Sequence, residues 1–196
     1  MKKFLALFIL AACSFVGAKA QFNFGVKAGV NVANVEELSK ENVLNADSYS
    51  GFYVGPKFDL TIIGRVGING SILYSHAGMV WADKQETINM NAIAVPLNLM
   101  VRLFGSEKFG LFLETGPQFD FNIGEKRHEL EDGHMSLDNS TLSFNLGASL
   151  HLLKFLQVGV NYNVPFGATS EFQFTDMQNK EAYKFNTIQA SAAIVF

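Results

Sequence analysis

The stretch QFNFGVKAGVNV, residues 21–32, alternates apolar and polar side chains without interruption. Side chains in an extended chain point to opposite faces with a period of two, so this stretch predicts a β-strand. One face carries Phe22, Phe24, Val26, Ala28, Val30 and Val32. The other carries Asn23, Gly25, Lys27, Gly29 and Asn31. If the apolar face is a core, the fold is a soluble sandwich or barrel. If it meets lipid, the polar face lines the inside of a barrel.

Seven further segments repeat this alternation, which gives eight strands, and no stretch has a helical period. They span residues 51–60, 65–75, 92–104, 109–123, 141–152, 156–166 and 187–196.

The connections between these segments alternate in length. Short ones at 61–64, 105–108 and 153–155 predict tight hairpin turns. Long polar ones fall at 33–50, 77–88, 124–140 and 167–183. Short turns at one end and long polar loops at the other are typical of an all-β, eight-stranded, antiparallel up-and-down transmembrane β-barrel. Both termini then lie at the short-turn end, the periplasmic side, and the long loops are extracellular.

The distribution of charge indicates which face meets water. The apolar face carries no Asp, Glu, Lys or Arg in any of the eight segments. The opposite face carries Lys27, Lys57, Asp59, Arg102, Glu114 and Asp120. An eight-stranded barrel has an interior just wide enough for side chains to fill, and much of the apolar set, in a chain with 19 Phe, would not fit there. A lipocalin-like soluble barrel would need a charged outer face, whereas this candidate outer face is rich in Gly and Asn. The apolar side chains therefore face lipid.

The six inward charges balance, and we expect them to form a network that plugs the lumen, because an unpaired buried charge is costly. Arg102 and Glu114 flank the 105–108 turn, and we expect them to pair along the inner wall. We also expect Lys27, Lys57 and Asp59 to group together. Pro96 and Pro117 lie inside predicted strands, where proline usually marks a bulge.

The first twenty residues predict a signal peptide. Lys2 and Lys3 precede the apolar stretch 4–16, which is too short to span a bilayer comfortably, and the small residues AKA follow at 18–20. We expect cleavage after Ala20 and a barrel domain over 21–196. The alternative is LAAC at 10–13, which resembles a lipobox with Cys13 as the lipidated residue. Because Cys13 is the single cysteine, no internal disulfide can form.

Several short motifs resemble the PorT-like outer-membrane β-barrel family of Gram-negative bacteria. They are VPL at 95–97, GPQF at 116–119, the GVKAGVN start and the terminal Phe196. The resemblance covers about 21–196 and implies an outer-membrane barrel; one branch of the family is tied to a protein-secretion system. The ending IQASAAIVF resembles the signal read by the barrel-assembly machinery, although Ala190 and Ala192 stand where larger apolar residues are usual.

Candidate chemistry is sparse. Ser75 and His76 are adjacent near the outer rim, but neighbours in a strand point to opposite faces. Ser149 and His151 share a face, at a separation of about 7 Å along the strand. The loop EKRHELEDGHMSLD, 125–138, could gather a cation with His128, His134, Glu129, Glu131 and Asp132, but it lacks the spacing of a zincin helix and favours a solvated acidic loop. We therefore assign no catalytic, cofactor or metal residues.

The sequence thus favours a non-enzymatic outer-membrane barrel with a structural or surface-interaction role through four long loops. A component of a secretion or assembly apparatus is the alternative, and a lipid-modifying enzyme is a third possibility. The expected partners are outer-membrane lipid, the barrel-assembly machinery during biogenesis and an unidentified partner of the loops. The net charge of −3 gives no indication of nucleic-acid binding.

Overall fold

The computed structural model describes residues 21–37, 49–81, 86–105, 109–124, 127–130, 133–137, 139–152, 155–167, 170–174 and 180–196. The expected signal peptide and the lipobox alternative at Cys13 lie outside these residues. Within these ranges, no helix has the length and apolarity needed to cross a membrane.

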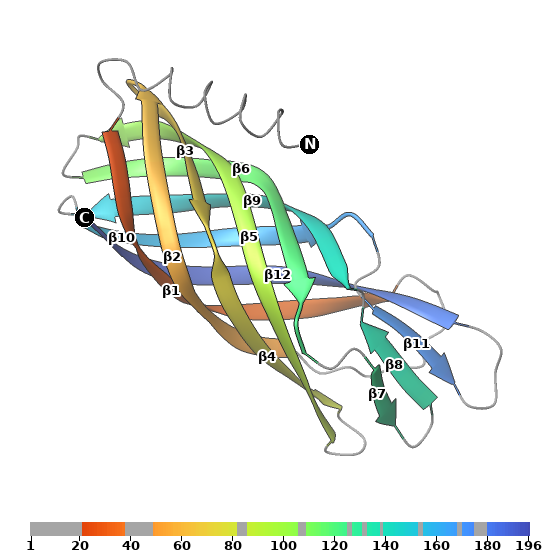
Figure 1. Cartoon of the computed structure of the whole chain (residues 1–196). Coiled ribbons are helices and arrows are strands. Elements are labelled where there is room, and N and C mark those ends of the chain that lie inside the picture. Colours follow the sequence, from red (N-terminus) through yellow and green to blue (C-terminus); the bar gives the residue numbers. More distant parts are fainter. Residues whose placement is uncertain are drawn as a thin grey trace, which may run out of the picture.

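A single antiparallel sheet winds through eight passes of chain and closes on itself (Figure 1). The third pass is divided into two strands at Ile72. The passes are β1 (Gln21–Glu37), β2 (Tyr49–Ile63), β3 (Val66–Ser71) with β4 (Leu73–Trp81), β5 (Glu86–Gly105), β6 (Phe109–Asn122), β9 (Ser140–Leu152), β10 (Leu156–Pro165) and β12 (Lys180–Val195). The predicted eight-stranded up-and-down barrel is confirmed.

The first and last strands close the barrel at the short-turn end. In this β1–β12 pair, the amide of Phe196 donates to the carbonyl of Phe24 at 2.7 Å. The amide of Val195 donates to the carbonyl of Phe155, next to the β9–β10 turn, at 2.8 Å. Between β2 and β3 the chain turns through Gly64, whose φ of 53° is the left-handed conformation that glycine adopts at no steric cost.

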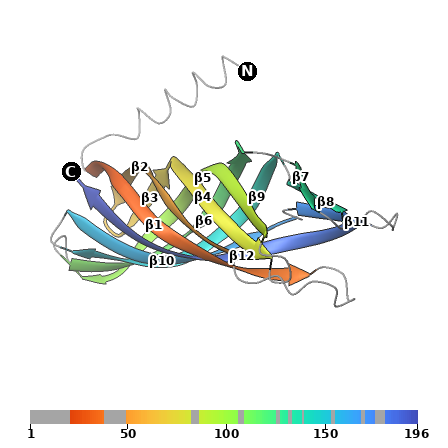
Figure 2. The same cartoon turned by 90° about the horizontal axis from the view of Figure 1, so that it is seen from below.

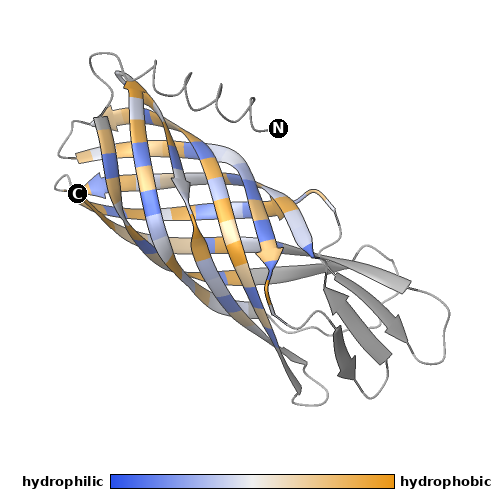
Figure 3. Ribbon diagram, viewed as in Figure 1, coloured by the Kyte–Doolittle hydropathy of each residue, from blue (hydrophilic) through white to orange (hydrophobic). Residues whose placement is uncertain are grey.

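The two faces of the wall have opposite character, as predicted. Outward side chains such as Phe22 and Val30 are 62% and 55% exposed, whereas the inward Lys27 is 7% exposed. Figure 3 shows the same alternation as hydrophobic and hydrophilic bands along each strand of the barrel. The apolar belt therefore lies outside and the polar residues inside.

Two of the predicted long loops are shorter than expected. The strand β1 continues to Glu37 and β2 begins at Tyr49, so part of 33–50 is wall. Most of 77–88 is also strand, because β4 ends at Trp81 and β5 begins at Glu86. The polar residues in these segments suggested loops, but the β1–β12 and β4–β5 ladders continue through part of them.

The other two long connections contain strands that form a small sheet beside the barrel rim. These strands are β7 (Arg127–Leu130), β8 (Gly133–Leu137) and β11 (Ser170–Phe174). The strand β11 pairs with the start of β12, with Ser170 opposite Tyr183. The strand β8 pairs with β11, and β7 pairs with β8. We call these three strands the rim extension; Figures 1 and 2 show it at the end opposite the C-terminus. The expectation of an irregular loop over 124–140 was wrong.

The predicted proline bulge is absent. The β5–β6 ladder keeps one register from Pro96 opposite Gln118 to Leu99 opposite Thr115. The register shifts instead between Arg102 and Phe104, close to the turn.

Candidate functional site

The lumen contains a buried ion pair next to the short-turn end. The ammonium of Lys57 lies 2.8 Å from Oδ1 of Asp59, and both side chains are at most 5% exposed. Gln157, from β10 on the opposite wall, joins both charges. It accepts from Lys57 and donates through Nε2 to Asp59 Oδ2 at 2.6 Å. Of the predicted grouping of Lys27, Lys57 and Asp59, the pairing of Lys57 with Asp59 is confirmed.

A second acidic group, Glu114, is also buried, at 4% exposure. It accepts a hydrogen bond from the hydroxyl of Ser149. The ammonium of Lys27 lies over the ring of Tyr53, 5.9 Å from its centroid. Tyr53 of β2 reaches over β1 and donates to the carbonyl of Ala190 on β12 at 3.2 Å. Its ring occupies the space where a side chain at Gly29 would stand, since a Cβ there would lie 2.4 Å from the ring.

The predicted pairing of Arg102 with Glu114 is wrong. Arg102 stands opposite Phe112 in the ladder, with its guanidinium 5.7 Å from the ring centroid, while Glu114 stands opposite Met100. The guanidinium donates to the carbonyl of Gly64 at 2.6 Å, at the exposed rim. Sequence reasoning placed the two residues on neighbouring strands but could not determine the direction of the arginine side chain.

A network of amides and hydroxyls fills the middle of the barrel. Asn163 donates to Asn145 at 2.7 Å and to Ser143 at 2.8 Å, and Asn145 donates to Gln118 at 3.1 Å. The network also includes Asn69, Asn98 and Asp120. Most of these side chains are 5% exposed or less. Together with the charges below it, the network plugs the lumen.

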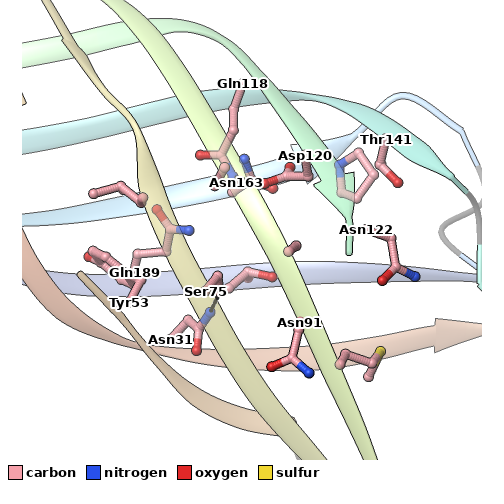
Figure 4. A pocket seen from close by; sticks show the side chains of 16 residues that line it. Asn31, Tyr53, Ser75, Asn91, Gln118, Asp120, Asn122, Thr141, Asn163 and Gln189 are labelled. Atoms are coloured by element: carbon pink, nitrogen blue, oxygen red, sulfur yellow. Dashed lines mark hydrogen bonds between the residues drawn. The ribbon is translucent and has the colours of Figure 1, made fainter. Parts of the chain in front are cut away.

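A cavity of about 130 Å³ lies on the long-connection side of this plug (Figure 4). Gln118, Asp120 and Asn163 of the network contribute to its lining. The remaining lining residues are Asn31, Tyr53, Leu73, Ser75, Met90, Asn91, Ala92, Ala94, Asn122, Thr141, Pro165, Thr187 and Gln189. Sequence reasoning identified the inward polar positions but not this cavity, because strand stagger decides which of them share a level.

Ser149 and His151 approach more closely than their strand spacing suggested. The hydroxyl oxygen lies 3.4 Å from Nε2 of His151. The single hydroxyl proton of Ser149 is donated to Glu114, so His151 does not accept it. His151 itself stacks on Phe112 at 3.9 Å between centroids. His151 is therefore packed against Phe112 and does not serve as the base for Ser149, whose hydroxyl proton goes to Glu114.

Ser75 and His76 point to opposite faces, as expected. The hydroxyl of Ser75 accepts from Asn31 at 3.3 Å in the lumen. His76 stands beside the outward Phe52, 5.4 Å between ring centroids, and its Nδ1 is 2.7 Å from Oδ1 of Asn91. The two groups cannot act on one substrate.

The acidic segment 125–138 stays untested as a cation site. Residues 125–126, 131–132 and 138 lie outside the described residues, and the candidate ligands His128, Glu129 and His134 are placed by their backbone alone. Elsewhere in the described ranges, no group of three or more His, Cys, Asp or Glu side chains is arranged to hold a metal ion.

Comparison with known families gives one match, to the outer membrane protein beta-barrel domain, over residues 17–195. A comparison with curated protein sequences finds no significant match.

Solved outer-membrane barrels share the architecture at low identity. Ail, the attachment invasion locus protein of Yersinia pestis, solved with the heparin analogue sucrose octasulfate, is 14% identical, with a TM-score of 0.52 over 90% of this chain and 99% of Ail. OprG of Pseudomonas aeruginosa is 11% identical, with a TM-score of 0.50 over 89% and 95%. The outer membrane protease OmpT of Escherichia coli is 8% identical, with a TM-score of 0.36 over 93% and 100%, too low to support an inference. These likenesses show the fold alone.

Proposed function

The chain belongs to the outer membrane protein beta-barrel domain family, and on that basis we propose that it is a non-enzymatic surface-interaction protein that binds its partner through the rim extension. The barrel places its apolar belt in the outer membrane. The rim extension would then stand outside the cell, and the termini would face the periplasm.

One observation carries this proposal: the rim extension is a small hydrogen-bonded sheet whose strands β7 and β8 take no part in the β1–β12 closure of the barrel. The strand β7 pairs with β8 and β8 pairs with β11, and in the described chain neither pairs with any of the eight barrel passes. Only β11 joins this sheet to the wall, through β12. A plugged lumen offers no wide path for solutes, so the extension is the part of the molecule best suited to contact a partner.

A deletion tests the proposal. Replacing residues 125–138 by an Asn-Gly turn removes β7 and β8 and leaves all barrel ladders intact. We expect a normally assembled barrel that loses the partners captured by cross-linking on intact cells. Replacement of residues 106–108 by Asn-Gly, in the β5–β6 connection, is the matched control and should retain them. Equal capture by both variants would contradict the proposal.

The orientation has its own test, because the expected mature chain contains no cysteine. Ser136→Cys places one thiol in β8, and Ser106→Cys places one in the β5–β6 connection. A membrane-impermeant maleimide added to intact cells should label the first variant and not the second. The reverse pattern would show that the extension faces the periplasm.

A component of a secretion or assembly apparatus is the alternative, and it rests on the motifs VPL at 95–97 and GPQF at 116–119, which resemble the PorT-like branch. It predicts that the cross-linked partners are envelope proteins and that their capture survives the deletion of β7 and β8. Among the described residues, Ser149 donates to Glu114 and Ser75 faces away from His76, which disfavours a lipid-modifying enzyme built on a Ser–His pair. An assay on lipid A with Ser75→Ala and His151→Ala variants checks that point; activity abolished by either substitution would contradict the non-enzymatic proposal.

A further inference from the structure

The lumen cavity is lined by one carboxylate and by no Lys or Arg side chain among the described residues. Its polar lining includes the carboxylate of Asp120, which accepts from Gln118 Nε2 at 2.8 Å and from the Ser143 hydroxyl at 3.4 Å. A carboxylate offers about four lone-pair sites, so these two neutral donors leave acceptor capacity unused. Among the described side chains, no Lys or Arg nitrogen lies at ion-pair distance from Asp120.

The cations of the lumen lie elsewhere. Lys57 forms its ion pair with Asp59. Lys27 is separated from the cavity by the ring of Tyr53 and lines the same small pocket as Glu114. Arg102 is at the short-turn rim, bonded to a backbone carbonyl. Lys27 and Lys57 therefore balance Asp59 and Glu114 on the short-turn side of the lumen, and no described Lys or Arg side chain compensates Asp120 next to the cavity.

A second observation points to a ligand that donates hydrogen bonds. Asn31 lines the cavity and is 5% exposed, and its Oδ1 has no hydrogen-bond partner. An unpaired buried acceptor is normally destabilising, and a ligand that donates to it removes that cost. Leu73 and Ala94 add an apolar part to the same lining, and each is less than 5% exposed.

We propose that this cavity binds a small alkylammonium ion, with the ammonium group at Asp120 and the methylene groups against Leu73 and Ala94. The carboxylate supplies the compensating charge, and the Asn31 carbonyl supplies a further acceptor. The cavity, at about 130 Å³, is close in size to the dry cavity of about 150 Å³ that admits benzene. It therefore fits a ligand of about five or six non-hydrogen atoms.

Titration calorimetry of the refolded barrel in detergent, at constant ionic strength, tests the proposal with n-butylammonium chloride. We expect saturable binding of one equivalent. Its neutral counterpart n-butanol should bind at least about tenfold more weakly, because a hydrogen bond to a charged group contributes about 1.5–3 kcal/mol. Equal binding of both compounds would overturn the assignment of Asp120 as the recognition group.

Three variants make the test specific. Asp120→Asn keeps the acceptor for Gln118 and removes the charge, and should weaken n-butylammonium binding about tenfold or more. Ala94 stands opposite Asp120 in the β5–β6 ladder. The substitution Ala94→Leu should fill the cavity and abolish binding while the carboxylate stays intact. Glu107→Gln, the same carboxyl-to-amide change outside the cavity lining, should bind as the unmodified protein does. Each variant is first checked for a heat-modifiable, folded barrel.

Calcium chloride is the competing probe. A divalent cation prefers six to eight oxygen ligands, and the single carboxylate here does not provide a comparable set. We expect calcium to leave n-butylammonium binding unchanged. The proposed ligand class would be wrong if the protein binds calcium saturably, loses that binding in Asp120→Asn and does not bind n-butylammonium. The proposed location would be wrong if Ala94→Leu still binds n-butylammonium.

Discussion

The ammonium of Lys57 and the carboxylate of Asp59 are two residues apart on one strand and form an ion pair of 2.8 Å inside the barrel. Residues i and i+2 share a face in a strand, so both side chains enter the lumen together. Gln157 of the opposite wall then bonds to both. This pair ties β2 to β10 across the interior.

Removal of one member of this pair should be strongly destabilising. Lys57→Met leaves Asp59 charged and unpaired, and loss of a single partner of a buried pair typically costs about 3–5 kcal/mol. We expect a loss of that size in the free energy of unfolding, measured by urea titration in lipid vesicles. The double variant Lys57→Met/Asp59→Leu is the control, and it should recover part of the stability. A double variant less stable than the single one would contradict the argument.

The substitution Arg102→Ala should be much milder than a pairing with Glu114 would have implied. The guanidinium bonds to the carbonyl of Gly64 at the exposed rim, and a hydrogen bond to a charged group contributes about 1.5–3 kcal/mol when it is well shielded. Exposure reduces this contribution, so we expect a loss of about 1 kcal/mol in the same urea titration. A loss above about 3 kcal/mol would indicate a buried ion pair after all.

The plug predicts that the barrel is not a general pore. Eight strands leave an interior that side chains fill, and the Asn145 and Asn163 network does so here. Planar-bilayer recordings of the purified barrel should show no steady conductance of porin size. Steady openings of that size would mean that the network is not maintained in the membrane.

Deletion of Phe196 should reduce the amount of assembled barrel. Its amide donates to Phe24 and its carbonyl accepts from Phe24, at 2.7 and 3.4 Å, so the deletion removes two bonds of the closing ladder. Heat-modifiability on gels and membrane fractionation measure the assembled fraction. Phe196→Leu retains the backbone bonds and should assemble better than the deletion. If the deletion assembles fully, closure does not depend on these bonds.

The number of strands and the face on which each side chain lies could be predicted from the sequence, because each alternating segment marks one strand and assigns its residues to two faces. Lys27 and Phe24 belong to opposite faces by position alone, whatever the stagger of the barrel. The strand ends were less predictable, because the ladder between β4 and β5 continues as far as Trp81 opposite Glu86, inside the predicted loop 77–88.

Contacts across the lumen were not readable, because they depend on stagger and on side-chain direction. Glu114 was expected to face Arg102, but it bonds to Ser149 on the next strand. The rim extension was missed for a different reason. Residues 127–137 are mostly polar and show no apolar alternation, although their backbones pair as β7 and β8.

The pairing of β1 with β12 joins the two most distant strands of the described chain. Contacts of such large sequence separation form late in folding, since a long loop must be ordered before they provide any stabilisation. Until that moment both edge strands expose rows of unpaired backbone groups, which hydrocarbon does not tolerate. The barrel therefore cannot enter the hydrocarbon one hairpin at a time: all eight passes must cross together, with β1 and β12 meeting as they do so.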